Sequence, residues 1–323
     1  MRLGVVFEPN SAAFYRAIDP MRVMEERGHT VVWPGTDGRG DARKLSGCDM
    51  VHVYRRADAE LQQLMRQGMP LTYDNDDDFT NVPRESPDYK KVGGANGIRI
   101  HALTVRMAKQ ARCFTTTNEV LAQRYRDDGV ERIEVIPNLV AADVPRPRAG
   151  HKGFVIGWVG GVDHRADVAR IPIKEALERL QAKYPDVHVE CIGVDLSLKE
   201  RYRHDGFVPF RELPARIGGW DLGIAPLADI PANRVRSDIK IKEYAASGVP
   251  WLASPVGPYA GHGEEQGGML VPDDGWLEAL EGMVTMGWWA RRGVTGKAAK
   301  WGRRSTIDAA ADRWVQLFTS AAR

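Results

Sequence analysis

Residues 153–161 read GFVIGWVGG, an apolar run that ends in a pair of glycines. Such a run, followed by a glycine turn, is typical of a buried strand in a parallel sheet. We expect a helix over residues 172–184 and a strand over 187–192 to follow it. The run therefore begins an α/β unit.

The first half of the chain has the same alternation of strand, turn and helix, which indicates a parallel sheet with helices on both faces. The strands expected there cover residues 2–7, 29–33, 49–54, 70–73, 111–116 and 133–136, with helices from about residue 14 and near 59–66, 98–109 and 118–125. Later strands are expected at 222–225 and 251–253, and a helix at 239–247. Two such units predict two Rossmann-like α/β domains whose parallel sheets face a central cleft, with ligands at the carboxyl ends of the strands.

The length of 323 residues suits two domains of ordinary size. Residues 141–152 contain two prolines, a glycine and several charges without periodicity, which is typical of a linker. We therefore expect an N-terminal domain over 1–140 and a C-terminal domain over 153–304. In residues 305–323 apolar side chains recur at helical spacing, so a last helix must pack one face against another part of the molecule.

The composition excludes several classes of protein. Hydrophobic residues make up 43% and charged residues 27%, as in a soluble globular protein, and no apolar run is long enough to span a bilayer. No signal-peptide pattern is present, and the three separated cysteines suggest neither a disulfide framework nor a zinc site, so we expect a cytoplasmic protein. The net charge of +2 does not argue for a polyanionic partner, and the basic cluster over 291–304 is typical of a solvated helix face.

Residues 233–259, NRVRSDIKIKEYAASGVPWLASPVGPY, contain the most informative polar pattern. Ser237 and Asp238 can cap a helix that carries Lys240 and Glu243 on one face. A cation near a helix N-terminus is electrostatically misplaced unless an anion binds there, and a diphosphate is such an anion. The alternative is an ordinary surface helix with an exposed lysine and glutamate.

The glycine turn Gly160–Gly161 is followed by Asp163, His164 and Arg165. Glycines at this point let the backbone approach a phosphate, and Arg165 could donate hydrogen bonds to it. The spacing differs from the dinucleotide-binding GxGxxG motif, so a plain tight turn remains the alternative.

Residues 73–79 read YDNDDDF, with four carboxylates directly after an expected buried strand. Carboxylates this dense repel one another, so they predict bound cations, hydroxyl donors such as those of a sugar, or an acid or base with a raised pKa. Asp76, Asp77 and Asp78 are the candidates for a base. Binding of a divalent metal ion is the alternative.

Two further groups of residues are candidates. The loop SAAFYR over 11–16 could bring Arg16 into the cleft to neutralise a departing phosphate, although Arg16 could equally lie on the surface. His101 and His164 are candidate bases, but a lone histidine is more often structural. No HExxH, paired CxxC, GxSxG or P-loop motif occurs, which argues against a dedicated transition-metal site, a serine hydrolase and a P-loop kinase.

Taken together, these motifs resemble the B-fold (GT-B) glycosyltransferases, especially the family 4 nucleotide-sugar transferases. The likeness covers nearly the whole chain. It is carried by residues 14–16 through 20 and 28–29, by 73–78, by TTN over 116–118 and VIPN over 135–138, by IGWVGG over 156–161, by DLGIAPL over 221–227, and by 240–250.

The resemblance implies roles for several residues. Glu243 would hold the donor ribose, while Ser237, Lys240 and the Gly160–Gly161 turn would hold the diphosphate. Many members have a second glutamate eight residues before the one matched by Glu243, but this chain has Val235 there. Asn233 or Arg236 could take its contact with the sugar. The last helix would cross back onto the N-terminal domain.

The function expected from these features is transfer of a sugar from a nucleoside-diphosphate donor, with Lys240 and either Arg16 or Arg165 stabilising the leaving group. No cofactor is then required and no divalent metal is expected, and the resemblance implies retention at the anomeric carbon. The acceptor, whether a saccharide, a lipid-linked glycan, a small molecule or DNA, is not identified by the residues. Three alternatives stay open: glycosylation of a modified DNA base, a nucleotide-sugar epimerase, and a non-catalytic sugar-nucleotide binding module.

Overall fold

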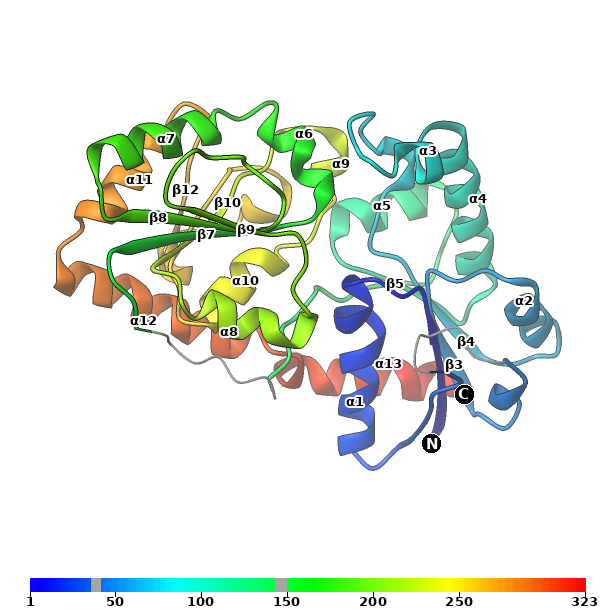
Figure 1. The fold of residues 1–323 in the computed structure, drawn as a ribbon. Coiled ribbons are helices and arrows are strands. Elements are labelled where there is room, and N and C mark those ends of the chain that lie inside the picture. The colour runs from blue at the N-terminus through cyan, green and yellow to red at the C-terminus, as the bar shows by residue number, and fades with distance from the viewer. Residues whose placement is uncertain (36–41, 143–149) are drawn as a thin grey trace.

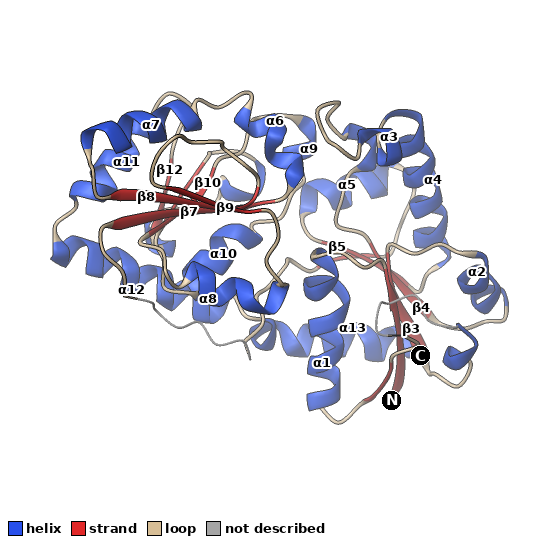
Figure 2. Cartoon of the chain, in the orientation of Figure 1, coloured by secondary structure: helices blue, strands red, loops and turns tan. Residues whose placement is uncertain are grey.

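The computed structural model describes residues 1–35, 42–142 and 150–323. In these residues the strands form two separate six-stranded sheets, and helices lie on both faces of each sheet (Figure 1, Figure 2). Every strand pairing in both sheets is parallel. The prediction of two α/β units with parallel sheets is therefore confirmed.

The N-terminal sheet has the strand order β2-β1-β3-β4-β5-β6. Its strands are β1 (Arg2–Phe7), β2 (Thr30–Val32), β3 (Met50–Tyr54), β4 (Leu71–Asp74), β5 (Cys113–Thr116) and β6 (Ile133–Val135). Around it lie η1 (Phe14–Ile18), α1 (Asp19–Glu26), η2 (Ala42–Leu45), α2 (Ala59–Arg66), η3 (Phe79–Asn81), α3 (Tyr89–Val92), α4 (Gly94–Gln110) and α5 (Glu119–Asp127). The strand order reverses between β1 and β3, so the loops after these two strands diverge and leave a crevice at the sheet edge.

The C-terminal sheet has the order β12-β11-β10-β7-β8-β9, which is the strand order of a Rossmann fold. Its strands are β7 (Phe154–Gly160), β8 (Val187–Gly193), β9 (Tyr202–Asp205), β10 (Leu222–Ala225), β11 (Trp251–Ala253) and β12 (Gly268–Leu270). The remaining elements are η4 (Val162–His164), α6 (Arg165–Val168), α7 (Ile173–Lys183), η5 (Phe210–Glu212), α8 (Leu213–Ile217), α9 (Pro231–Arg234), α10 (Ile239–Ala246), η6 (Gly257–Tyr259), η7 (Glu264–Gln266), α11 (Trp276–Thr285) and α12 (Trp288–Arg304). The crevice of this sheet lies between β7 and β10.

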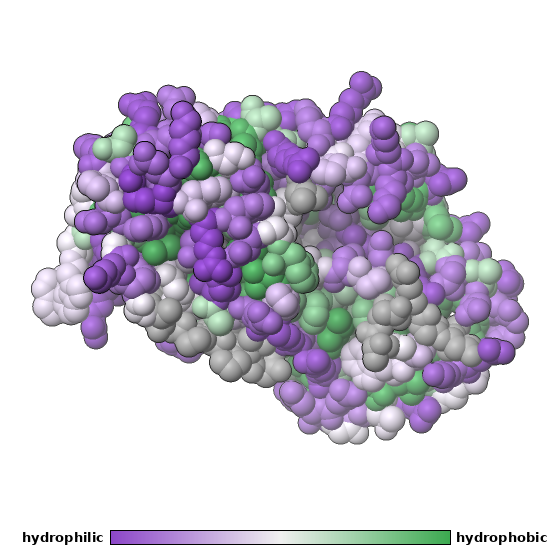
Figure 3. Space-filling model, viewed as in Figure 1, coloured by the Kyte–Doolittle hydropathy of each residue, from purple (hydrophilic) through white to green (hydrophobic). Residues whose placement is uncertain are grey.

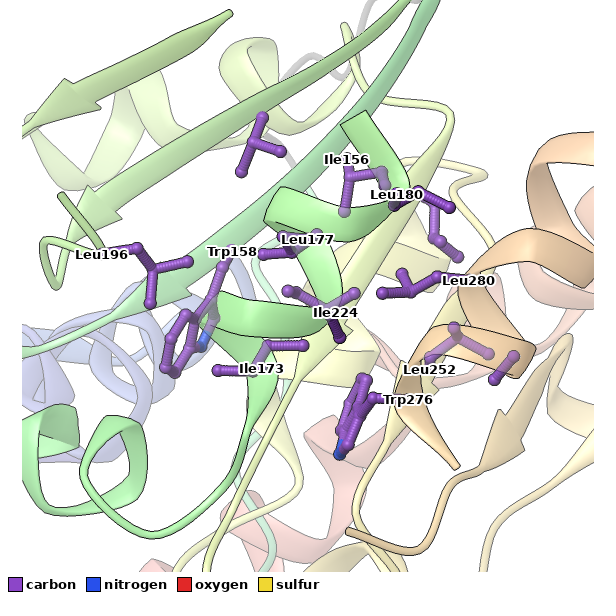
Figure 4. Close-up of a cluster of buried hydrophobic side chains, with 14 of the residues drawn as sticks. Ile156, Trp158, Ile173, Leu177, Leu180, Leu196, Ile224, Leu252, Trp276 and Leu280 are labelled. Carbon is purple, nitrogen blue, oxygen red and sulfur yellow. The ribbon is translucent and has the colours of Figure 1, made fainter. Parts of the chain in front are cut away.

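The core of the C-terminal domain is built on both faces of β7. On one face Trp158 packs with Leu177 of α7 and Ile224 of β10 (Figure 4). On the other face Trp220 lies directly against Gly157, where an added Cβ would stand 1.9 Å from the indole ring. A glycine in the middle of this strand is therefore required by packing, because any side chain would displace the tryptophan.

The last helix α13 (Ala311–Ala322) and the short η8 (Ile307–Ala310) return to the N-terminal domain, as predicted (Figure 1). Trp314 and Phe318 of α13 are fully buried in a cluster with Leu3 of β1 and Met24 of α1. The apolar face of the helix thus completes the core of the first domain, although it is separated from that domain in sequence by the whole second domain.

Several elements differ from the sequence expectation. Helix α4 begins at Gly94, four residues before the predicted start. Its residue 97 packs against the backbone carbonyl oxygen of Phe79, which lies so close that only a glycine fits there. Strands β9 and β12 and helix α11 were not predicted, because they are short or follow loops rich in glycine. Of the predicted linker over 141–152, residues 143–149 lie outside the described residues.

In residues 1–35, 42–142 and 150–323, none of the helices combines the length and the apolar composition that crossing a bilayer requires.

Candidate active site

A cleft of about 550 Å³ lies between the two domains. Its walls are the loops that follow β1, β3 and β4 in one domain and β7 in the other, together with the start of α10. These are the carboxyl ends of the strands beside each crevice, where open parallel sheets bind ligands. In the space-filling view the boundary between the two halves is hollowed and bordered by hydrophilic residues (Figure 3).

Two cations, Arg236 and Lys240, line the cleft at the start of α10. The Arg236 guanidinium donates from Nε to Asn233 Oδ1 at 2.9 Å, and neither cation forms an ion pair within the part of the chain that the structure describes. Burial and, to a smaller extent, the charge of Arg236 lower the pKa of Lys240 to about 8. The two charges therefore form an electropositive site that an anion would stabilise.

Glu243 lies one turn after Lys240 and lines the same cleft, with 5% of its surface exposed. The Tyr15 hydroxyl donates to Glu243 Oε1 at 3.4 Å, which connects η1 of the first domain with α10. Ser237 also lines the cleft, and its hydroxyl accepts a hydrogen bond of 3.1 Å from Asn138. The expected capping hydrogen bond is absent, because the Asp238 carboxylate instead pairs with Lys242 and His262.

The Gly160–Gly161 turn lines the cleft opposite α10, and His164 lies beneath it. His164 Nδ1 lies 2.6 Å from Asp167 Oδ2, and Asp167 Oδ1 accepts from Asn233 Nδ2 at 2.7 Å. Because Asn233 also holds Arg236, a buried chain of hydrogen bonds joins the turn to the cation pair. Burial lowers the pKa of His164 to about 3, so its imidazole is neutral at neutral pH.

The acidic stretch over 76–78 forms the opposite wall of the cleft, in the N-terminal domain. Arg55 pairs with both Asp76, at 2.9 Å, and Asp77, while Arg124 pairs with Asp78. Burial raises the pKa of Asp76, and Asp77 and Asp74 add to this against the attraction of Arg55. For Asp77 burial opposes ionisation, but attraction to Arg55 and Arg236 outweighs it and lowers the pKa.

Asp76 and Asp77 share Arg55, while Asp78 has its own set of partners. Asp78 accepts hydrogen bonds from the Thr80 backbone and hydroxyl and from Asn81, and Asp76 accepts one of 2.8 Å from Tyr54. Among the described residues no group of three or more His, Cys, Asp or Glu side chains is arranged to hold a metal ion.

Three sequence-predicted residues lie away from the cleft. Arg16 is fully buried, because it pairs with Asp74 at 2.5 Å and donates to the carbonyl oxygen of Ile136, so the expectation that it enters the cleft is wrong. Attraction to Asp74 outweighs burial and raises the pKa of Arg16.

His101 lies on α4, where Nε2 contacts Asp128 at 2.7 Å and the ring stacks on Tyr125, so it does not line the cleft as a base. Arg165 is exposed at the start of α6 and does not line the cleft.

Asn233 supports the site from behind. Its side chain is 2% exposed and bonded to Asp167, Ala228 and Arg236, so it positions Arg236 rather than lining the cleft. Val235 is also 2% exposed and packs in the apolar cluster of the N-terminal domain. Asn233 therefore does not reach the cleft in place of the second glutamate, whereas Arg236 lines the cleft and stays the candidate for that contact with the sugar.

Sequence reasoning missed Arg55 and Asp167. Arg55 lies at the cleft in the left-handed region at φ 58°, with its guanidinium 5.2 Å from the ring centroids of Tyr54 and Phe79. The sequence could have indicated that Arg55 lies at the cleft, because Arg55 directly follows a buried strand, as the acidic stretch does. Asp167 carried no such signal, since its role depends on three partners that only the fold brings together.

No protein-family model and no curated protein sequence matches the chain. Solved structures do. Sucrose-phosphate synthase from Thermosynechococcus elongatus superposes with a TM-score of 0.66 at 14% identity, covering 98% of each chain. A glycosyltransferase from Rickettsia africae gives a TM-score of 0.68 at 12% identity, covering 100% of this chain and 98% of its own.

Anabaena HepE, solved in complex with UDP-glucose, gives a TM-score of 0.64 at 14% identity, covering 99% of each chain. The structural similarity extends over both domains and the returning C-terminal helix. Because the sequence identity is low, the assignment to family 4 stays a prediction. The chain thus has the complete two-domain GT-B fold found in these glycosyltransferases.

Proposed function

We propose that the protein is a glycosyltransferase that moves a sugar from a nucleoside-diphosphate donor to an acceptor bound in the same cleft. The observation that carries this proposal is the pair of cations, Arg236 and Lys240, which lines the cleft without an ion-pair partner in the described residues. Burial of a lysine next to an arginine is costly unless an anion neutralises them, and a diphosphate would do so at the N-terminus of α10.

The donor would extend from this point in two directions. The Gly160–Gly161 turn leaves room for the diphosphate to approach the backbone, since nothing lies within 4 Å of an added Cβ at Gly161. Glu243, one turn further along α10, is suited to accept hydrogen bonds from ribose hydroxyls. The complexes of Anabaena HepE with UDP and with UDP-glucose support a donor of this class on this fold.

The leaving group in this proposal is the nucleoside diphosphate, and the bond that breaks joins its outer phosphate oxygen to the anomeric carbon. Arg236, Lys240 and the backbone N–H groups at the start of α10 would stabilise the negative charge that develops on this oxygen. Since these groups supply the positive charge, we propose that the reaction needs no divalent ion. The resemblance to the family 4 transferases is the reason for which we also propose retention of the anomeric configuration.

The acceptor would bind against the acidic wall. Asp76 has a raised pKa and lies within the cleft lining, so it is the best placed of the three aspartates to exchange a proton with an acceptor hydroxyl. Asp77 stays ionised beside Arg55 and can accept hydrogen bonds from further hydroxyls.

We propose the cytoplasm as the compartment, because all three cysteines are free thiols.

The test uses the purified chain with a panel of nucleoside-diphosphate sugars. At least one donor is expected to raise the melting temperature and to release nucleoside diphosphate when acceptors are added. Glu243→Ala and Lys240→Ala should abolish both effects, while Lys199→Ala, which removes an exposed cation of the same domain, should leave them unchanged. Intact binding and turnover in both cleft variants would contradict the proposed site.

One observation favours a second candidate, a sugar-nucleotide binding module without turnover. The position that bears a glutamate in the resembling family is Val235, which is buried away from the cleft. Donor binding that depends on Lys240 but gives neither hydrolysis nor transfer with any acceptor would favour the module. A rearranged sugar formed without acceptor would instead indicate an epimerase.

A further inference from the structure

Helix α12 carries an unusual exposed face outside the cleft. Its first two residues, Trp288 and Trp289, are 61% and 79% exposed. Five exposed cations follow on the same helix: Arg292, Lys297, Lys300, Arg303 and Arg304. The helix contains no aspartate or glutamate.

The tryptophans and the cations share one half of the helix surface. Positions 289, 292, 296, 300 and 303 recur at intervals of three or four residues. Trp289, Arg292, Lys300 and Arg303 therefore lie along one stripe, roughly 20 Å long, with Gly296 in its middle. The opposite side packs on α10, where Gly302 approaches the backbone of Ala246 so closely that an added Cβ would stand 2.4 Å from it. The helix is therefore fixed to the domain with its basic half facing outward.

The charge of this face is not neutralised by neighbouring groups. Within the described ranges none of the five cations forms an ion pair. Helix α12 also contacts η7, which carries Glu264 and Glu265, but in the described residues neither glutamate pairs with a cation of this face. Arg291 is not part of the face, because it donates to the carbonyl oxygen of Val284 and lies over Phe154.

We propose that this face of α12 docks on the surface of an anionic phospholipid bilayer. Tryptophan rings are most stable at the boundary between headgroups and acyl chains, and lysine and arginine side chains beside them reach the lipid phosphates. The tryptophan pair lies at the tip of the C-terminal domain farthest from the N-terminal domain, where α12 begins (Figure 1). The pair would enter the headgroup region while the stripe of cations lies along the surface.

The same face is less suited to nucleic acid. Single strands stack their bases on open, separated aromatic faces along a groove. Here the Arg292 guanidinium lies 5.4 Å from the centroid of Trp288, and the ring of Trp289 meets that of Trp288 at 79° with centroids 4.4 Å apart. The two rings thus contact each other and Arg292 instead of presenting open, separated faces for stacking.

The experiment measures sedimentation of the full chain with vesicles of phosphatidylcholine alone and of phosphatidylcholine with phosphatidylserine. Binding is expected only to the anionic vesicles and should fall steeply with salt. Two variants should each weaken it by at least about tenfold: Trp288→Ala/Trp289→Ala, and the triple change Lys297→Gln/Lys300→Gln/Arg303→Gln. All five side chains are solvent-exposed, so melting temperatures should stay at the wild-type value.

Matched controls remove equivalent groups elsewhere on the surface. Phe207→Ala deletes another exposed aromatic side chain, 81% exposed, and Arg22→Gln/Arg132→Gln/Lys199→Gln removes three exposed cations outside α12; both should bind like the wild type. Three results would overturn the proposal: no binding to anionic vesicles, binding that both α12 variants retain, or tighter binding to DNA than to vesicles through the same α12 residues.

Discussion

Lys240 is the single residue on which the electrostatics of the cleft depend most. Its ammonium group is partly buried beside Arg236, and this lowers its pKa to about 8 from the ordinary 10.5. A bound diphosphate would reverse the effect, since an anion favours the protonated lysine. Donor binding and protonation of Lys240 should therefore be coupled.

This coupling predicts that affinity for a nucleoside diphosphate falls as the pH rises through about 8. Free protein with a neutral Lys240 must gain a proton to bind, so the dissociation constant should increase about tenfold from about pH 7 to about pH 9. Lys240→Arg, which stays charged in this range, should show a flatter profile by calorimetry. An equally steep profile in Lys240→Arg would exclude Lys240 as the group responsible.

His164 predicts a second pH dependence, in stability. Its pKa is lowered from 6.5 to about 3 in the folded protein, chiefly by burial, so the unfolded chain binds more protons between these values. Stability should therefore fall as the pH decreases from about 6.5 towards 3. The urea midpoint of His164→Asn should fall less over this window than that of the wild type; parallel curves would show that other groups dominate.

The contrast between Arg16 and Lys240 shows what the sequence could reveal about the site. Both were predicted to reach the cleft as cations near a helix start. Lys240 does, because its position on the helix face follows from spacing alone. Arg16 turns inward because Asp74, 58 residues later in the chain, offers it a buried carboxylate, and such a long-range pair leaves no local pattern.

Helix α13 shows how far the sequence predicts whole elements. Its apolar spacing predicts a packed face, and the resemblance predicts the domain that receives it. The residues that α13 contacts could not be predicted from the sequence: Trp314 packs edge-on against His52 of β3, with ring centroids 5.9 Å apart.

The basic residues of α12 likewise predict a solvated helix face, but they do not predict that the two tryptophans at its start are exposed.

Removing the indole of Trp314 should destabilise the N-terminal domain. The side chain is fully buried, so Trp314→Ala is expected to cost about 3–5 kcal/mol of unfolding free energy through lost contacts and a cavity. Arg313→Ala, one residue earlier on the exposed side of the helix, should cost less than about 1 kcal/mol. Chemical denaturation measures both, and equal losses would mean that α13 is not an integral part of that core.

Over the whole molecule, contacts beside the cleft connect the two domains. On one side Phe14 stacks on Phe210 with centroids 4.0 Å apart, and Arg211 pairs with Asp19. On the other, Ser86 contacts Asp163 and Arg170 pairs with Glu85 at 2.7 Å. Two α/β domains were predictable from alternating elements, but this pairing of surfaces was not, because each contact joins loops whose positions depend on the completed sheets.

The Arg211–Asp19 pair should couple the stability of the two domains. Asp19 is 3% exposed, so Arg211→Gln, which removes this ion pair from a buried carboxylate, is expected to cost about 1–3 kcal/mol. The double variant Asp19→Asn/Arg211→Gln should cost less than the sum of the two single changes. Strict additivity in a denaturation cycle would show that the pair contributes no coupling.

The most direct test of the account is a crystal structure of the protein with a nucleoside diphosphate bound. The account predicts that the diphosphate lies between the Gly160–Gly161 turn and the start of α10, within hydrogen-bond distance of Arg236 and Lys240, and that the ribose hydroxyls contact Glu243. A nucleotide bound outside the interdomain cleft, or in the cleft without contact to either cation, would contradict it.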